Sequence, residues 1–228
     1  MSDNRVRLFS DLVSRADSEI CMPAAALAIA RVGYPDLEID SCLDRLDEMG
    51  RLAAVSLRGV EFEREVAALG EVVFGELGFS GDRENYYDPR NSFLNDVLAR
   101  RRGIPITISL VYIEIAALCG IGVSGVGFPG HFLVRHDVDG ALLDPFNKGA
   151  RVDDDGCRKL LDMQGLRDVE DLTPYLQVVS RRQMLERMLN NLGRHYAEVR
   201  DSEKLALVSE FAEALRPGSD QKSPGLVH

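Results

Sequence analysis

His131 and Asp144 are the two side chains in this sequence whose types and spacing could do chemistry together. A histidine whose ring is oriented by a carboxylate is the general-base half of a nucleophilic triad, because the carboxylate fixes the ring tautomer and stabilises the imidazolium. The alternative is structural: the pair would hold a hairpin together, with Asp144 capping a strand end before Pro145. The residues alone leave both interpretations open.

The elements that must position this pair predict a β-hairpin. β-type residues fill 123–128 and 132–138, and 141–143 gives the returning strand. Asp139-Gly140 is a strong signal for a two-residue turn between the strands.

The register of this hairpin decides whether the pair can meet. A two-residue turn would set His131 opposite Lys148 and leave Asp144 on the order of 13 Å away along the strand. A four-residue loop over 136–139 would set His131 directly opposite Asp144. Any even-length loop without a bulge puts both side chains on one face of the sheet, because side chains alternate with a period of two.

A mostly buried helix is predicted before the hairpin, from about Ile106 to Cys119, because apolar residues recur there at three- and four-residue steps. Pro105 suits its first position, since proline has no amide hydrogen to leave unpaired. Gly120 suits its exit, where a left-handed residue usually ends a helix.

Two hydroxyl residues near the start of this helix are candidate nucleophiles for the pair. Ser109 lies on the same helical face as Pro105 but one turn, about 5.4 Å, further from the N-terminus. Thr107 is nearer the end but rotated about 200° from Pro105. A Ser109–His131–Asp144 arrangement is therefore a candidate that needs a shift of the helix.

Composition limits the partners. The chain has 228 residues, 45% of them hydrophobic and 28% charged, which is ordinary for a globular protein. Its net charge of −10 repels nucleic acid and anionic lipid on average. Three arginines at 100–102 form a short basic run, which a helix C-terminus and nearby carboxylates would compensate. We therefore expect a protein or peptide partner, neither nucleic acid nor membrane, while the oligomeric state stays open.

The four cysteines are far apart and form no C-x-x-C pair, which indicates neither a zinc site nor a redox motif. No metal or other cofactor is expected. The sequence has no secretory apolar segment and no apolar run long enough for a bilayer, so we expect a cytoplasmic protein with reduced thiols.

The flanks of the central stretch are helical in period. Amphipathic helices fill 6–79, a turn-rich connector follows at 79–90, and a short helix reaches about Arg102. After the hairpin come a helix capped by aspartates at 153–155 and a helix pair with its break near Arg200-Asp201. The predicted division is an N-terminal helical region (1–85), a core (86–165), a C-terminal helical region (166–216) and a disordered tail (217–228).

Three segments together carry a family resemblance: YYDPRNSFLNDVLARRRGIPITISLVYIEIAALCGI, GVGFPGHFLVRH and LLDPFN. They resemble the SirB-type branch of the transglutaminase-like superfamily, over about Phe9 to Leu215. The resemblance implies an α+β fold: a transglutaminase-like, papain-like core with a small antiparallel sheet packed on a central helix, flanked by N- and C-terminal helical regions. The C-terminal helices would be tetratricopeptide-like.

The resemblance also implies residue roles. In the wider superfamily a cysteine at the start of the central helix is the nucleophile, a histidine on a following strand the base, and an aspartate on the next strand its orienter. His131 and Asp144 match the last two. The cysteine of a Gly-x-Cys motif falls on Pro105, within Gly103-Ile104-Pro105.

Two functional hypotheses follow. The preferred one is a non-catalytic binding or regulatory module that uses the remnant cleft near His131 and Asp144, with Tyr112 or Tyr87 lining it. The alternative is a hydrolase or acyl transferase on peptide or amide bonds, with Ser109 or a threonine as nucleophile.

Overall fold

The computed structural model describes residues 3–216, so the expected tail at 217–228 lies outside the described part of the chain. The α-helices are α1 (Asn4–Val13), α2 (Met22–Ala30), α3 (Ile39–Ser56), α4 (Phe62–Gly70), α5 (Leu94–Arg100), α6 (Pro105–Leu118), α7 (Asp154–Met163), α8 (Arg181–Glu198) and α9 (Ser202–Ala214). The strands are β1 (Ser80–Gly81), β2 (Arg102–Gly103), β3 (Val123–Val126), β4 (Leu133–His136), β5 (Leu142–Asp144) and β6 (Ala150–Arg151). Short helical segments are η1 (Asp17–Glu19), η2 (Glu71–Glu76), η3 (Pro89–Asn91), η4 (Pro145–Asn147) and η5 (Thr173–Tyr175).

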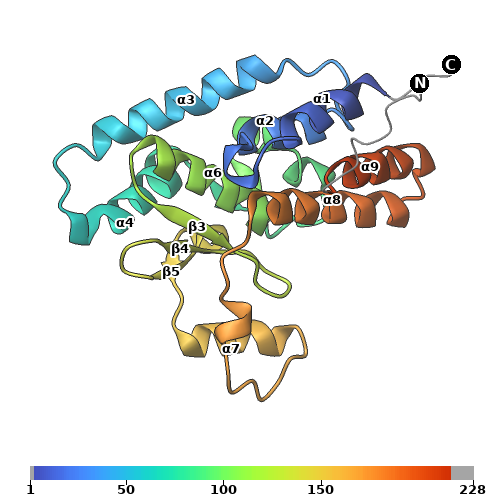
Figure 1. Cartoon of the computed structure of the whole chain (residues 1–228). Coiled ribbons are helices and arrows are strands. Elements are labelled where there is room, and N and C mark those ends of the chain that lie inside the picture. The colour runs from blue at the N-terminus through green and yellow to red at the C-terminus, as the bar shows by residue number, and fades with distance from the viewer. Residues whose placement is uncertain (1–2, 217–228) are drawn as a thin grey trace, which may run out of the picture.

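Helix α6 lies at the centre, with α3 above it, the sheet below it and α8 beside it (Figure 1). It begins at Pro105, and Gly120, with a φ of 77°, follows its end, as predicted. Most residues of α6 are buried, so the helix is not amphipathic. This burial makes the start of α6 a rigid base for a site.

The antiparallel sheet β3-β4-β5-β6 has helices on both faces. Val134 and Leu143 belong to the large core that includes α6, whereas Val126 and Leu133 pack with Leu161 of α7 in a second core. Neighbouring strand residues therefore serve opposite faces, as the pleat requires. The α+β prediction, a small antiparallel sheet on a central helix with helical flanks, is confirmed.

The register of the β4–β5 hairpin differs from both sequence alternatives. Val134 pairs with Leu143, so the loop has four residues, 137–140, and the two-residue Asp139-Gly140 turn is wrong. Gly140 still adopts a positive φ, of 73°, but it is the last residue of the four-residue loop. Its backbone amide donates to the carbonyl of His136. Because the loop length is even, the prediction that His131 and Asp144 share a face holds.

Helical predictions on the N-terminal side are right in type and imprecise at the ends. The last of the helices expected within 6–79 starts at Phe62 and changes at Glu71 into a π-helical segment. The short helix expected after the 79–90 connector divides into η3 and α5. Local hydrogen bonding near caps decides such boundaries.

The two ends of the described chain meet beside α8. The guanidinium of Arg182 donates to carbonyls of Val13, Arg15 and Leu215, which ties α1 and the end of α9 to the start of α8. Helices α8 and α9 pack together, and the break between them falls at Arg200, with a φ of 59°, as predicted. Across the residues that the structure describes, none of the helices has both the length and the apolar character to cross a bilayer.

Candidate functional site

The His131–Asp144 pair forms. His131 Nε2 lies 2.8 Å from Asp144 Oδ2, and the histidine and aspartate side chains are 12% and 4% exposed. The observed register, extended by one residue, sets Asp144 opposite Leu133. His131 lies two residues before Leu133 in the chain and contacts Asp144 from there. The Nδ1 atom of His131 has no hydrogen bond to any residue that the structure describes.

Asp144 is fixed by the turn that follows it. Pro145 ends strand β5, and one carboxylate oxygen of Asp144 accepts from the backbone amide of Asn147, at 3.2 Å. The other oxygen accepts from the Asn147 side chain as well as contacting His131. The predicted strand-end cap and the predicted histidine partner are thus one and the same carboxylate.

His131 is held through its backbone. The Nη2 atom of Arg187, on α8, donates to the carbonyl oxygens of Phe128, at 2.7 Å, and of His131. Gly130, with a φ of 63°, provides the turn before the histidine, and a side chain there would meet Gln164 at 2.1 Å. Helix α8 thereby positions the loop that carries His131.

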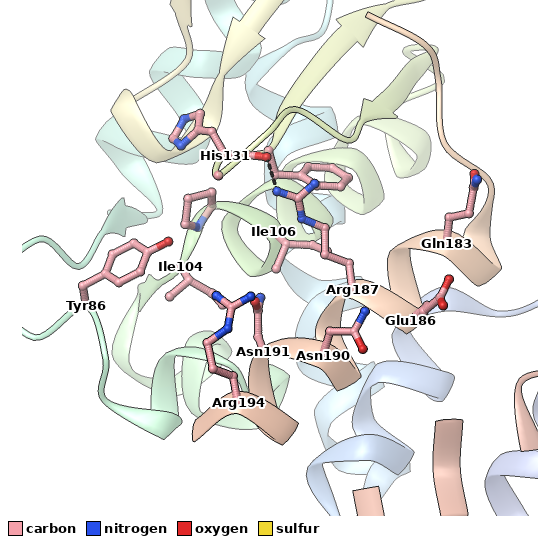
Figure 2. Close-up of a pocket in the computed structure, with 13 residues that line it drawn as sticks. Tyr86, Ile104, Ile106, His131, Gln183, Glu186, Arg187, Asn190, Asn191 and Arg194 are labelled. Atoms are coloured by element: carbon pink, nitrogen blue, oxygen red, sulfur yellow. Dashed lines mark hydrogen bonds between the residues drawn. The ribbon is translucent and has the colours of Figure 1, made fainter. Parts of the chain in front are cut away.

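A pocket of about 420 Å³ opens beside this pair (Figure 2). One wall is the start of α6, the second is the 130–132 loop with Tyr86 nearby, and the third is the polar face of α8. The α8 residues that line it are Gln183, Glu186, Arg187, Asn190, Asn191 and Arg194. His131 and Pro105, the position to which the resemblance assigns the nucleophile, line the same pocket.

The hydroxyl groups near the start of α6 lie outside this pocket. Thr107 is buried, and its Oγ1 accepts from the amide of Ile104 and lies 2.7 Å from the carbonyl of Asn91, to which it donates. Ser109 is also buried, with its Oγ 3.5 Å from the carbonyl of Phe132. The structure therefore brings His131 to Asp144 but gives Ser109 a place in the core.

Thiols are equally remote from the pair. Burial raises the pKa of the Cys119 thiol, at the end of α6, and that of the Cys157 thiol, within α7. Among the described residues that line the pocket there is no cysteine, serine, threonine or lysine.

The prediction that Tyr112 or Tyr87 lines the cleft is wrong. Tyr112 is fully buried and stacks on Phe74 with ring centroids 5.6 Å apart, and burial raises the pKa of its hydroxyl. Tyr87 is 81% exposed and does not line the pocket. The tyrosine that does is Tyr86.

Sequence reasoning missed the α8 wall. Arg187, Asn190 and Arg194 recur at three- and four-residue steps, a pattern that equally describes the solvated face of any amphipathic helix. Nothing in the local sequence links residue 131 to residue 187, so a pocket lined by both could not be predicted. In the described part of the chain, no group of three or more His, Cys, Asp and Glu side chains is placed to hold a metal ion.

The fold and the site together define a class: an α+β core in which a histidine just before strand β4 and an aspartate at the end of strand β5 form a pair in a pocket at the start of a central helix. Comparison with protein families agrees. The chain belongs to the transglutaminase-like superfamily, whose family model matches residues 40–190, about two thirds of its length.

Individual relatives are similar over most of the chain. A UPF0162 protein of Xylella fastidiosa (strain 9a5c) is 37% identical over 227 residues, which cover 92% of this chain and 79% of the relative. A UPF0162 protein of Pseudomonas aeruginosa is 35% identical over 79% of this chain and 69% of its own length. Human F-box only protein 21 is 34% identical over 58% of this chain and 22% of its own length. No solved structure matches.

Proposed function

We propose that this protein is a non-catalytic binding or regulatory module of the SirB-type branch, which uses the pocket beside His131 to hold a protein or peptide segment. The observation that carries the proposal is Pro105. It lies at the first position of α6, in the same pocket as His131, and it offers no group that could attack a carbonyl.

The surroundings of His131 support binding rather than turnover. A nucleophile needs to be within hydrogen-bond reach of its base, and the described lining residues supply no thiol or aliphatic hydroxyl. Tyr86 is the one hydroxyl there, and burial raises its pKa, which disfavours the phenolate. The α8 wall supplies amide and guanidinium donors, which suit the carbonyl groups of an extended chain.

The C-terminal helices are part of this proposal. We infer that α8 and α9 act as one tetratricopeptide-like unit that leans on the core and lends one helix face to the pocket. A single such unit cannot bury its own apolar face, and Met184, Leu185 and Met188 of α8 lie in the large core with α6. A cytoplasmic location, consistent with four free cysteines in the structure, belongs to the same proposal.

A selection from a random peptide library on the full chain tests the binding proposal. Selected peptides should bind the native protein and lose affinity on His131→Ala. The matched control is His195→Ala, which changes a partly exposed histidine on α8 outside the pocket lining and should leave binding unchanged. Peptides that bind both variants as they bind the native protein would place the binding surface elsewhere.

The alternative, a hydrolase or acyl transferase, draws support from the formed His131–Asp144 pair. Turnover of peptide or amide substrates by the native chain, lost in Ser109→Ala or His131→Ala, would establish it and end the binding-only proposal. Our expectation is no turnover in any of the three proteins.

A further inference from the structure

The pocket beside His131 carries positive charge that the protein itself does not neutralise. Arg187 and Arg194 lie seven residues apart on α8, about two turns, and so on one face. Arg194 is exposed and has no hydrogen bond or ion pair with any described residue. Arg187 lies over the Phe132 ring, 5.6 Å from its centroid, and uses only Nη2 for the two loop carbonyls, which leaves Nη1 and Nε without hydrogen-bond partners among the described residues.

Both guanidinium groups face the same space. In Figure 2, Arg187 extends from α8 to the backbone carbonyl of His131, and Arg194 extends from the same helix toward Ile104, on the side of Tyr86. Burial raises the pKa of Tyr86, while Arg187 and Arg194 both act to lower it, so both cations lie within electrostatic reach of that hydroxyl. Burial also lowers the pKa of Arg187, the mark of a cation that is partly desolvated without a carboxylate beside it.

This concentration of cations stands out in a chain of net charge −10. The one acidic side chain among the described lining residues is Glu186, which Figure 2 places with Gln183 on the far side from Arg194. The start of α6 adds the positive end of a helix dipole to the opposite wall. The pocket therefore favours an anionic group near Arg194.

The remaining walls indicate what else the ligand carries. Ile104, Pro105 and Ile106 form an apolar surface at the start of α6. Asn190 and Asn191 present side-chain amides, each able to donate to a carbonyl and accept from an amide. Guanidinium groups bind carboxylates through two parallel hydrogen bonds, and a partly enclosed site strengthens them.

We propose that the pocket recognises a carboxylate of a peptide ligand, held by Arg194 and Arg187, with a neighbouring apolar side chain against Ile104 and Pro105. The proposal rests on the binding function above and specifies its chemistry. The carboxylate has two possible sources, the C-terminus of a chain or an acidic side chain within it.

Three small probes separate these sources on the full-length protein, followed by amide chemical shifts in NMR titrations. N-acetyl-leucine has a terminal carboxylate, N-acetyl-glutamic acid α-amide has a side-chain carboxylate, and N-acetyl-leucinamide has neither. We expect one or both acids to shift resonances of the pocket and the neutral amide to bind at least about tenfold more weakly. The tighter acid identifies the source.

Variants of Arg194 link the binding to this pocket. Arg194→Met should weaken the preferred acid about tenfold, and Arg194→Lys, which keeps the charge but not the fork of donors, should weaken it less. The matched control is Arg167→Met, which removes an exposed arginine outside the pocket lining and should change nothing. Because Arg194 is exposed, these variants should fold as the native protein does.

Three results would overturn the carboxylate proposal: equal affinity for the acid and the amide, no acid binding at millimolar concentration, or equal loss in the Arg167 and Arg194 variants. The proposed function fails differently. If library-selected peptides depend on His131 but not on a carboxylate or Arg194, the binding module stands and only its ligand chemistry is wrong.

Discussion

Two histidines five residues apart on one hairpin have different surroundings. His136, at the end of β4, is 1% exposed, and both of its ring nitrogens are engaged: Nδ1 lies 2.7 Å from Asp139 Oδ1 and Nε2 lies 2.9 Å from Glu65 Oε1. His131 contacts one carboxylate through Nε2, and its other nitrogen has no described partner. Both are histidine–carboxylate pairs, but only His131 lines a pocket.

The difference shows what turns such a pair into a candidate site. His136 joins the hairpin loop to α4, since Asp139 belongs to the loop and Glu65 to the helix. Two carboxylates leave its ring no free nitrogen, so its contribution is to stability. At His131 the second nitrogen has no hydrogen-bond partner among the described residues, and the described lining of its pocket includes Pro105 but no thiol or aliphatic hydroxyl.

The largest effect that this comparison predicts is on stability. His136→Ala should lower the free energy of unfolding by about 2–3 kcal/mol, because it removes a buried ring and two hydrogen bonds to charged groups. His131→Ala should cost less than about 1 kcal/mol, since Asp144 keeps its bonds to Asn147. Urea denaturation of both variants measures the two values. Equal losses would favour the purely structural role for His131.

Replacing Pro105 tests whether His131 can act on a side chain at that position. In Pro105→Cys a thiol would stand at the N-terminus of α6 in the pocket of His131, a position that lowers a thiol pKa through the helix dipole and a neighbouring histidine. We expect it to react with iodoacetamide about ten- to a hundredfold faster than the partly buried Cys119, with modification followed by peptide mass spectrometry.

The control for the thiol variant is Pro105→Cys combined with His131→Ala, which should lose most of the added reactivity. The same histidine change in the native protein should leave its four cysteines unaffected. If the new thiol reacts no faster than Cys119 in either background, His131 does not act on position 105.

Glu114 on α6 shows what burial does to a carboxylate that has no histidine partner. Burial raises its pKa to about 7, against a small opposing effect from Arg181. The folded state thus binds more protons than the unfolded state between about pH 4.5 and 7, and this group makes the protein less stable as the pH rises through that window. Glu114→Gln should be more stable than the native protein at pH 8, by on the order of 1–3 kcal/mol.

Thermal unfolding of native protein and Glu114→Gln at pH 4 and pH 8 measures this effect. The two proteins should unfold alike at pH 4, where the native carboxyl is neutral. A constant offset at both pH values would mean that packing, not ionisation, separates them.

The smallest effect concerns Ser109. Ser109→Ala should change the free energy of unfolding by less than about 1 kcal/mol, because its contact with the Phe132 carbonyl is long, at 3.5 Å. It should leave peptide binding unchanged. A tenfold loss of binding with an unchanged unfolding curve would bring Ser109 back into the site.

Much of the site could be predicted locally. Alternation of side chains predicted a shared face for His131 and Asp144 with any even loop, but their contact depended on a register that the sequence left open. The two-residue turn was wrong because the Asp139 side chain accepts from the Ala141 amide and from His136, which stabilises a four-residue loop instead. Tyr112 was misplaced because an apolar helix buried on all sides gives no periodic signal for which face meets a cleft.

The sequence by itself determined α6, from its apolar period, Pro105 and Gly120. Only the tertiary structure decided that α8 closes the pocket, that Arg187 holds the histidine loop, and that Ser109 and Thr107 face inward. The reason is physical: helix and strand periods are local, whereas the meeting of residues 131 and 187 depends on how whole elements pack. The positive charge of the pocket likewise depends on how the elements pack.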